Sequence, residues 1–340
     1  MNHRTAAFQL LPITFNGLVI ENTNRCNAKC SMCYQSSGPH GSDIFGKHHL
    51  KNSVIKKAMK DAQNISALES RFHLAGGESF LEPESCFELF EYAKFCGYKK
   101  ITTTTNCYWG YKLDSAKSFA KRMKISGVTQ IEISWDIWHL PYIKPDSVNN
   151  AIIACSEQGI YTNLRVLATK SHSIEEALLL LSSDALNLVD EISTGAVFRT
   201  GRAKVELDAG DFFSGTGEGG NCHSVLHLTV NARGDVYPCC AGADQTDSLS
   251  FGNIHNESIS NIYSVMNNSR LLRTLVFQGV GAFVPILEAH GFILDQSFGN
   301  ICNLCWNIFS NAEYSKIIKD HFKDLDEIAN NKLLSALETN

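Results

Sequence analysis

The chain has 340 residues, a formal net charge of −5, 44% hydrophobic residues and 19% charged residues. This composition is ordinary for a folded protein and excludes an intrinsically disordered chain. The acidic balance argues against nucleic acid as the main partner, because phosphate binding needs a basic surface. The apolar stretch at 6–15 is interrupted by Gln9 and Pro12 and lacks a small-residue cleavage site, and no run reaches the roughly 20 apolar residues of a membrane helix. We therefore expect a cytoplasmic protein that binds neither a membrane nor nucleic acid.

Short apolar, β-branched runs alternate with amphipathic stretches along the first 200 or so residues, which is the pattern of repeated βα units around a parallel sheet. The runs predict six strands, at 17–21, 72–75, 100–104, 130–134, 161–168 and 191–198. The stretches between them predict helices at 51–68, 84–96, 114–126, 145–158 and 174–186. Prolines lie near helix starts and glycines follow helix ends, as helix capping favours. We therefore expect an α/β fold, a partial (β/α)6, TIM-like barrel.

A segment rich in Gly, Ser and Asp, residues 208–221, separates this barrel from the rest of the chain. After it, residues 227–230 and 235–237 flank a turn and predict a hairpin, and the remaining sequence is mostly helical. The predicted division is a barrel at 1–207, a linker at 208–221, a small extension at 222–310 and a C-terminal helix at 311–340.

Twelve cysteines in a chain expected to be cytoplasmic indicate metal or redox chemistry. Cys26, Cys30 and Cys33 follow the first predicted strand on a loop, where parallel α/β folds place their chemistry. Three thiolates can hold a four-iron cluster and leave one iron open for a small chelating ligand. Zinc is the alternative, although no fourth Cys or His follows at finger spacing before His40.

The spacing Cys26-x-x-x-Cys30-x-x-Cys33 resembles the motif of the radical S-adenosylmethionine (SAM) superfamily, and the resemblance extends from Gly17 to about residue 202. It implies a [4Fe–4S] cluster on these three cysteines that cleaves SAM into a hydrogen-abstracting radical. One departure is Met32, which stands where the family usually has an aromatic residue. The contact with the adenine of SAM would then shift to Tyr34, two residues further along the chain.

The same resemblance implies SAM contacts at the ends of later strands. Gly76 and Gly77 let the backbone approach a ligand, and Glu78 can accept hydrogen bonds from the SAM amino group. Asp136 and His139 have an alternative role as a proton pair on the substrate side. The other contacts implied are Ser134 and Asp136 for the ribose, Arg165 for the carboxylate, and Arg202, in a Gly-Arg-Ala turn, near the adenine.

The second half of the chain resembles the opening of the SPASM extension of radical SAM enzymes that modify peptides, in Cys222 and in Gly234-Asp-Val-Tyr-Pro-Cys-Cys240. Because only Cys302-x-x-Cys305 follows, the resemblance implies the shortened twitch form. A single auxiliary [4Fe–4S] cluster would then be held by Cys222, Cys239, Cys302 and Cys305. Four thiols also suit tetrahedral zinc, which remains an alternative.

Two adjacent cysteines, Cys239 and Cys240, compete for one ligand position. If Cys239 is the ligand, Cys240 points elsewhere and can donate a hydrogen atom to a substrate radical. If Cys240 is the ligand, the roles swap.

Three functions fit these features. The first is modification of a ribosomally made peptide by epimerisation or crosslinking, which the SPASM-like opening favours. The second is oxidation or epimerisation of a small molecule such as an aminosugar or cyclitol. The third is a non-enzymatic iron–sulfur scaffold or sensor. An enzyme of this kind needs an electron donor such as flavodoxin or ferredoxin. A peptide substrate would also need a separate leader-peptide-binding protein or a groove between barrel and extension.

Overall fold

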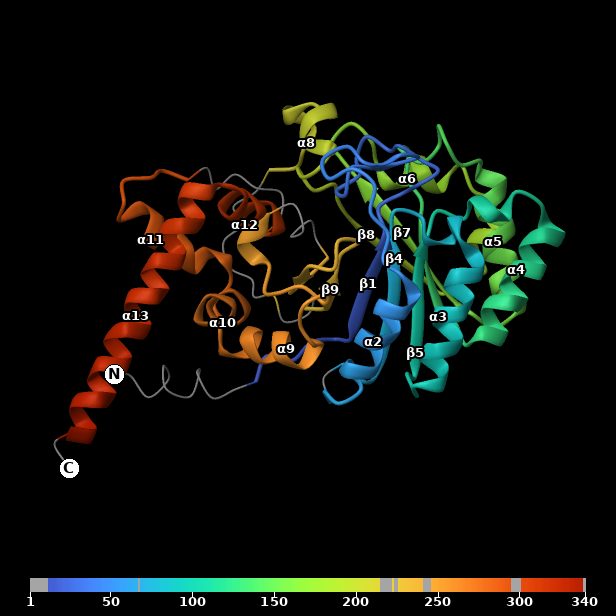
Figure 1. Cartoon of the computed structure of the whole chain (residues 1–340). Helices are drawn as coiled ribbons and strands as arrows, with labels where there is room; N and C mark the ends of the chain where they lie inside the picture. Colours follow the sequence, from blue (N-terminus) through green and yellow to red (C-terminus); the bar gives the residue numbers. More distant parts are fainter. Residues whose placement is uncertain are drawn as a thin grey trace.

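The computed structural model describes residues 12–66, 68–214, 222, 226–240, 246–294 and 301–338. Within these residues a sheet of eight strands runs in the order β10-β9-β1-β4-β5-β6-β7-β8 (Figure 1). Neighbouring strands from β1 to β8 are all parallel. The six strands of this parallel part are β1 (Leu18–Thr23), β4 (Arg71–Gly76), β5 (Lys100–Thr105), β6 (Gln130–Ser134), β7 (Tyr161–Ala168) and β8 (Glu191–Ala196). All six predicted strands are therefore confirmed, with small shifts at their ends.

Helices cover the outer face of this parallel sheet. They are α2 (Asn52–Ala62), α3 (Pro83–Phe95), α4 (Leu113–Ser126) and α5 (Pro145–Glu157). In α2 the buried residues Ile55, Ala58, Met59 and Ala62 recur at the spacing of one helical face. They join the core that lies between helices and sheet. This packing is the partial barrel that the sequence predicts.

Two predicted helices differ from the structure. The helix expected at 51–68 ends at Ala62, and the polar residues that follow form turns. The stretch at 174–186 forms two short helices, α6 (Ile174–Leu178) and α7 (Ser183–Leu186), because Ser182 caps a new helix by accepting a hydrogen bond from Ala185 N.

The inner face of the barrel is polar. Successive strand residues point to opposite faces, and the core takes residues such as Phe72, Ile131 and Leu164. Their neighbours therefore face the interior; they include Arg71, His73, Glu132, Asn163 and Arg165. An interior lined in this way can receive a polar ligand at the end of the sheet where the strands terminate.

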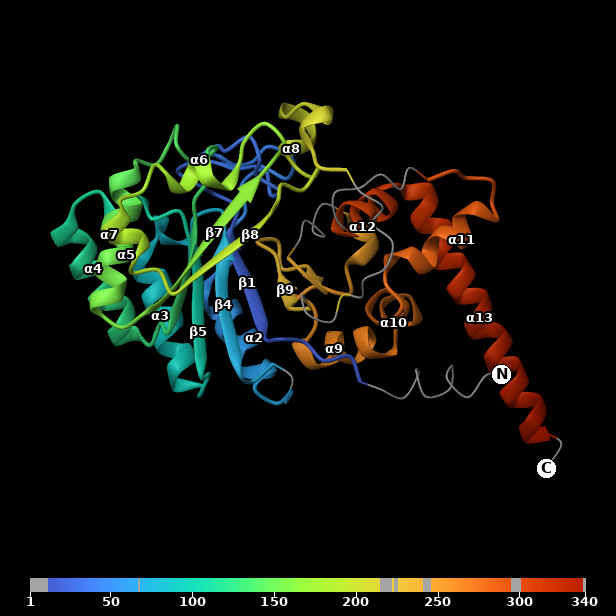
Figure 2. The ribbon, with the colours of Figure 1, turned by 180° about the vertical axis from the view of Figure 1, so that it is seen from behind.

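The extension continues the barrel sheet at its open edge (Figure 2). Strand β9 (Leu228–Val230) pairs in parallel with β1, and β10 (Val236–Tyr237) pairs antiparallel with β9. The predicted hairpin is confirmed, but its pairing with the first strand was not predicted. The helices that follow are α9 (Ile259–Asn268), α10 (Arg270–Phe277), α11 (Val284–Glu288), α12 (Ile301–Ser310) and α13 (Ala312–Glu338).

The division of the chain into domains stays a prediction, and the linker expected at 208–221 lies partly outside the described residues. Among the helices that the structure describes, none combines the length and the apolar character needed to cross a membrane.

Candidate active site

The cysteine loop, residues 24–46, follows β1 at the end of the sheet where the strands terminate, at the top of Figure 1. Cys26 and Cys30 are buried and Cys33 is half-buried. Burial raises the pKa of the Cys26 thiol well above its ordinary value, and the charges of Glu78, Cys33 and Cys30 raise it further. The three thiols thus lie within electrostatic reach of one another. A cation such as iron would favour the thiolate form of Cys26, which burial and these charges disfavour.

Hydrogen-bond donors already approach these sulfurs. Ala28 N lies 3.4 Å from Cys26 Sγ, and Asn106 Nδ2 lies 3.7 Å from the same sulfur. Across the described ranges, no three or more His, Cys, Asp or Glu side chains come close enough together to hold a single metal ion. Hydrogen bonds to ligand sulfurs tune a cluster, so these two donors are compatible with Cys26 as the expected cluster ligand.

The two glycines after β4 let its end pack directly on the start of the cysteine loop. An ideal Cβ on Gly76 would lie 2.3 Å from Thr23 O, and one on Gly77 would lie 2.1 Å from Arg25 O. In place of side chains there are backbone hydrogen bonds, from Gly77 N to Thr23 O at 2.7 Å and from Glu78 N to Arg25 O at 2.8 Å. The motif therefore fixes where the cysteine loop begins.

Glu78 is a buried carboxyl group beside this junction, only 1% exposed. It accepts hydrogen bonds from Asn106 N at 2.8 Å, Thr105 Oγ1 at 3.0 Å and Phe80 N at 3.3 Å. Burial raises the pKa of Glu78 to about 7, although these hydrogen bonds oppose the shift. A carboxyl group balanced near neutrality can respond to a cation such as an ammonium group. The predicted contact with the SAM amino group stays a prediction.

Asp136 and His139 form the expected pair after β6. His139 Nδ1 lies 2.7 Å from Asp136 Oδ1, and Trp138 N donates to the same oxygen at 3.2 Å. Burial alone would lower the pKa of His139, but Asp136 and Cys30 outweigh it and raise the pKa well above its ordinary value. The pair therefore lies beside the cysteine loop. Ser134, the last residue of β6, is half-buried nearby, and the ribose contacts stay predictions.

Arg165 lies on β7 beside Ser134 and faces the barrel interior, as its predicted role requires. Its guanidinium reaches toward β8, since an ideal Cβ on Gly195 would lie 3.1 Å from Arg165 Nη2. The contact between Arg165 and the SAM carboxylate stays a prediction.

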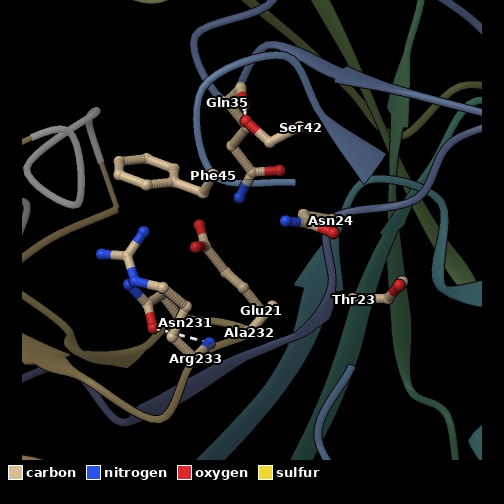
Figure 3. A pocket seen from close by; sticks show the side chains of 9 residues that line it. All are labelled: Glu21, Thr23, Asn24, Gln35, Ser42, Phe45, Asn231, Ala232 and Arg233. Atoms are coloured by element: carbon tan, nitrogen blue, oxygen red, sulfur yellow. Dashed lines mark hydrogen bonds between the residues drawn. The ribbon is translucent and has the colours of Figure 1, made fainter. Parts of the chain in front are cut away.

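Tyr34 donates its hydroxyl to Glu21 Oε1 at 2.9 Å. Glu21 belongs to a polar pocket between the cysteine loop and the β9–β10 turn (Figure 3). Arg233 stacks over the Phe45 ring there, 3.9 Å from its centroid. The predicted adenine contact of Tyr34 stays a prediction. The residues that line the pocket are Glu21, Thr23, Asn24, Gln35, Ser42, Phe45, Asn231, Ala232 and Arg233.

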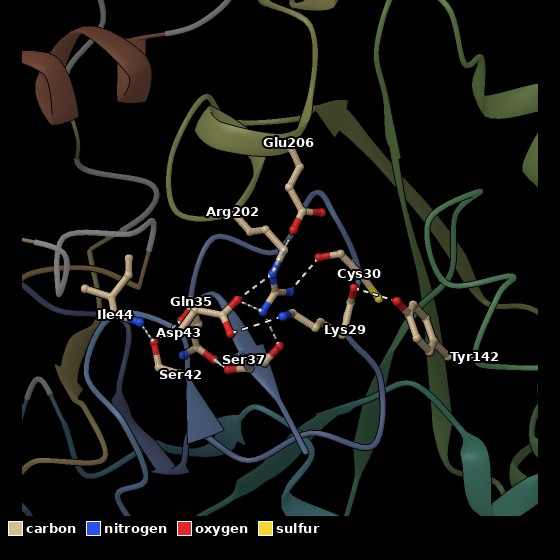
Figure 4. A network of polar contacts seen from close by, with 10 residues as sticks. All are labelled: Lys29, Cys30, Gln35, Ser37, Ser42, Asp43, Ile44, Tyr142, Arg202 and Glu206. Carbon is tan, nitrogen blue, oxygen red and sulfur yellow. Dashed lines mark hydrogen bonds and ion pairs between the residues drawn. The ribbon is translucent and has the colours of Figure 1, made fainter. Parts of the chain in front are cut away.

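Arg202 is buried, and its guanidinium is bonded to the cysteine loop (Figure 4). It donates to Cys30 O at 2.8 Å and to Ser37 O at 2.7 Å. The sequence motif predicts a contact near the adenine and gives no sign of this role. The adenine contact stays a prediction.

The four cysteines expected around an auxiliary cluster come from three segments of the chain, and the charges of three of them act on the fourth, Cys305. Cys302 and Cys305 lie one turn apart on α12. Burial raises the pKa of the Cys305 thiol well above its ordinary value, and the charges of Cys239, Cys222 and Cys302 add to this effect. Burial likewise raises the pKa of Cys222 to about 11, with a further contribution from Cys302. Thiolates at these positions would repel one another, and binding a positively charged cluster would offset that repulsion.

Cys240 faces different neighbours from those of Cys239. Part of Cys240 is exposed to solvent. Burial of the thiol nevertheless raises its pKa to about 12, and the charges of Glu21 and Glu132 raise the pKa further. Because even an ordinary thiol pKa lies above neutrality, Cys240 is protonated at pH 7. Glu132 faces the barrel interior, whereas the charge of Cys239 acts on Cys305 of α12. This arrangement favours Cys239 as the ligand.

Sequence reasoning missed the polar residues inside the barrel. His73 bridges Thr102 Oγ1 at 2.7 Å and Thr104 Oγ1 at 3.0 Å, and burial lowers its pKa to about 3, so it is neutral. Arg71 and Glu132 lie within electrostatic reach of each other. Polar residues at alternate positions of predicted strands, as in Arg71-Phe-His-Leu, carry the signal that could have found them.

Two family profiles match the chain. Residues 20–151 match the radical SAM superfamily, and residues 222–306 match SPASM, an iron–sulfur cluster-binding domain. The chain is therefore a radical SAM protein with a C-terminal SPASM domain. Its first domain binds a [4Fe–4S] cluster and SAM. Its SPASM domain binds auxiliary iron–sulfur clusters.

One relative covers nearly the whole chain. This is "Putative peptide biosynthesis protein YydG" of Bacillus subtilis (strain 168), 27% identical over 300 residues, which are 85% of this chain and 91% of YydG. A shorter match is to GTP 3′,8-cyclase of Vibrio vulnificus (strain YJ016), 29% identical over 126 residues, 36% of this chain and 34% of that protein.

Solved structures share the fold. Native anSMEcpe with bound AdoMet has a TM-score of 0.55 at 16% identity and covers 93% of this chain and 99% of its own. A histidine-tagged form of anSMEcpe with bound AdoMet has a TM-score of 0.52 at 16% identity, covering 95% of this chain and 98% of its own. The expected partial barrel with a C-terminal extension is thereby confirmed.

Proposed function

We propose that this protein modifies a peptide by removing a hydrogen atom from a Cα position and returning one from Cys240 on the opposite face, which epimerises the residue. The observation that carries the proposal is the place of Cys240, which directly follows the expected ligand Cys239 and lies within electrostatic reach of Glu21 and Glu132 on strands of the barrel. The match across 91% of a protein described as acting in peptide biosynthesis supports a peptide as substrate. Crosslinking, which needs no returned hydrogen, is the alternative outcome on the same substrate.

The proposal gives each cysteine group one task. Cys26, Cys30 and Cys33 hold the first cluster, which with SAM supplies a 5′-deoxyadenosyl radical that abstracts hydrogen. The side chains and backbone around it position SAM: Tyr34, Gly76, Gly77, Glu78, Ser134, Asp136 and Arg165. A single auxiliary [4Fe–4S] centre is held by Cys222, Cys239, Cys302 and Cys305.

Cys240 acts as a hydrogen-atom donor rather than as an acid. Its S–H bond breaks and a C–H bond forms at the substrate carbon, which leaves a thiyl radical on Cys240. One electron from a flavodoxin or ferredoxin and one proton from solvent would restore the thiol, and an auxiliary centre on the four cysteines would supply the path for that electron. A raised thiol pKa suits this task, because the thiolate has no hydrogen atom to give.

The proposal also implies partners and a compartment. A low-potential electron donor and thiols kept reduced both favour the cytoplasm. A separate leader-peptide-binding protein would deliver the peptide, or a groove between the barrel and the extension would hold it.

Deuterium incorporation tests the proposal. The reconstituted enzyme is incubated anaerobically in D₂O with dithionite, SAM and peptides encoded beside its gene, and products are analysed by mass spectrometry. We expect one deuterium per modified residue, none with Cys240→Ala, and normal 5′-deoxyadenosine formation in both. Cys96→Ala, at the end of α3, is the matched control. Deuterium retained by Cys240→Ala would reject the donor role, and turnover of an aminosugar or cyclitol but no peptide would favour the small-molecule function.

A further inference from the structure

The chain that leaves β8 packs tightly on the middle of the cysteine loop, at Cys33 and Tyr34. Gly201 has a φ of +54°, and an ideal Cβ there would lie 2.1 Å from Tyr34 O. The next residue, Arg202, donates its backbone N–H to Cys33 O at 3.0 Å and then begins the short helix α8 (Ala203–Glu206). The backbone at 201–202 therefore touches the loop immediately at its third cysteine.

The Arg202 side chain reaches back along the same loop and bonds it at three further positions (Figure 4). Nη1 donates to Cys30 O at 2.8 Å, and Nη2 donates to Ser37 O at 2.7 Å. Nε and Nη2 both donate to Asp43 Oδ2, at 2.9 and 2.8 Å. One planar group thus joins loop positions as far apart as Cys30 and Asp43, a geometry that lysine cannot reproduce.

The same group carries a buried positive charge. Arg202 is only 3% exposed. Its counter-charges lie on the exposed side: Asp43, which is shared with Lys29 at 3.4 Å, and Glu206, whose Oε1 lies 3.7 Å from Arg202 Nε. Arg202 also lies directly at the third cysteine, since its backbone N–H donates to Cys33 O at 3.0 Å. A buried guanidinium beside the cysteines stabilises added negative charge there, because the surroundings screen it weakly.

We propose that Arg202 is a positioning residue of the cysteine loop, with two separable effects: its hydrogen-bond fork holds the loop around the first cluster, and its charge favours the reduced state of that cluster. The inference rests on the proposed assignment of Cys26, Cys30 and Cys33 as ligands. It differs from the adenine contact that the sequence motif predicts for Arg202.

Two substitutions separate the effects. Arg202→Lys keeps the charge and loses the fork, so the reconstituted enzyme should release iron to a chelator about tenfold faster while its cluster potential stays near that of the parent. Arg202→Met loses both, so release is equally fast. The equilibrium constant for one-electron reduction of the SAM-binding cluster should then fall about tenfold, which is about 59 mV. Potentials are read by electron paramagnetic resonance, using the spectral change on SAM addition to identify that cluster.

Arg199→Met is the matched control, because Arg199 lies just before this turn and stacks on Phe212, 5.9 Å from its ring centroid. It should change neither readout. If Arg202→Met does not fold, Asp43→Asn takes its place in the release assay, where it should also accelerate iron loss. Asp43 lies at the open side of the fork, since its side chain is 46% exposed.

Iron release at the parental rate in Arg202→Lys would overturn the role of the hydrogen-bond fork. An unchanged cluster potential in Arg202→Met would overturn the charge effect. If Arg202→Lys retained iron normally but bound SAM more weakly, the result would favour the adenine contact of Arg202 over its positioning role. None of these readouts needs the peptide, so a failure of the proposed peptide reaction can be told apart from a failure of the Arg202 inference. If Cys30→Ala retained the first cluster, the ligand assignment itself would fail.

Discussion

Replacing Gly77 by alanine tests whether the Gly-Gly-Glu motif works by letting two backbones touch. The added Cβ would lie 2.1 Å from Arg25 O, about 1.3 Å inside the 3.4 Å at which ordinary contact begins. Backbone cannot move aside as a flexible side chain can, so Arg25 or the end of β4 must shift. Overpacking of this kind costs about 1–3 kcal/mol. Because Cys26 is the next residue after Arg25, the shift also displaces the first thiol.

We expect Gly77→Ala to melt several degrees below the parent and to form 5′-deoxyadenosine about 100-fold more slowly, since a 1 Å misplacement can cost that much. Melting is followed by circular dichroism on the apoprotein, and the product is quantified by mass spectrometry. Gly281→Ala is the control, because a Cβ at Gly281 meets nothing within 4 Å. A Gly77→Ala protein with parental melting and cleavage would refute the close-contact reasoning.

Three further predictions concern the cysteines and Glu78. Cys30→Ala should abolish 5′-deoxyadenosine formation, and normal formation would remove the ligand assignment. Cys222→Ala should lower bound iron to about half while SAM cleavage stays measurable; an unchanged iron count would contradict the auxiliary site. Folding raises the pKa of Glu78 from 4.5 to about 7, so ionisation destabilises the apoprotein, an effect absent below about pH 4.5 and complete above about pH 7. At most about 3 kcal/mol of stability is lost over that window, and Glu78→Gln should flatten this part of the profile in urea titrations at pH 5 and pH 8. An equal slope in both proteins would show that Glu78 is not the titrating group.

Local sequence signals were sufficient for the barrel. Apolar alternation and helix caps reflect interactions within a few residues, so they predicted all six parallel strands and most outer helices. They failed where a second cap interrupted a periodic stretch, at Ser182. The resemblance of the three-cysteine spacing to the radical SAM motif pointed to the chemistry, and the family match over residues 20–151 bears it out.

Long-range contacts could not be predicted in this way. The parallel pairing of β9 with β1 joins residues more than 200 positions apart, and it places the β9–β10 turn against the cysteine loop at the Glu21 pocket. The bonds of Arg202 to Cys30 and Ser37 join the two ends of the barrel.

The sequence by itself determined the strands of the barrel, which follow from periodicity, and its resemblance to the radical SAM family pointed to cysteines as the iron ligands. It left open the choice between Cys239 and Cys240, because adjacent residues share the same local signal. The tertiary structure gives them different surroundings, since the charge of Cys239 acts on Cys305 of α12 while Cys240 lies near the charges of Glu21 and Glu132, and the assignment of Cys239 as the ligand stays a prediction. The surroundings of a side chain are decided by segments packed from far along the chain, and no local pattern carries that information.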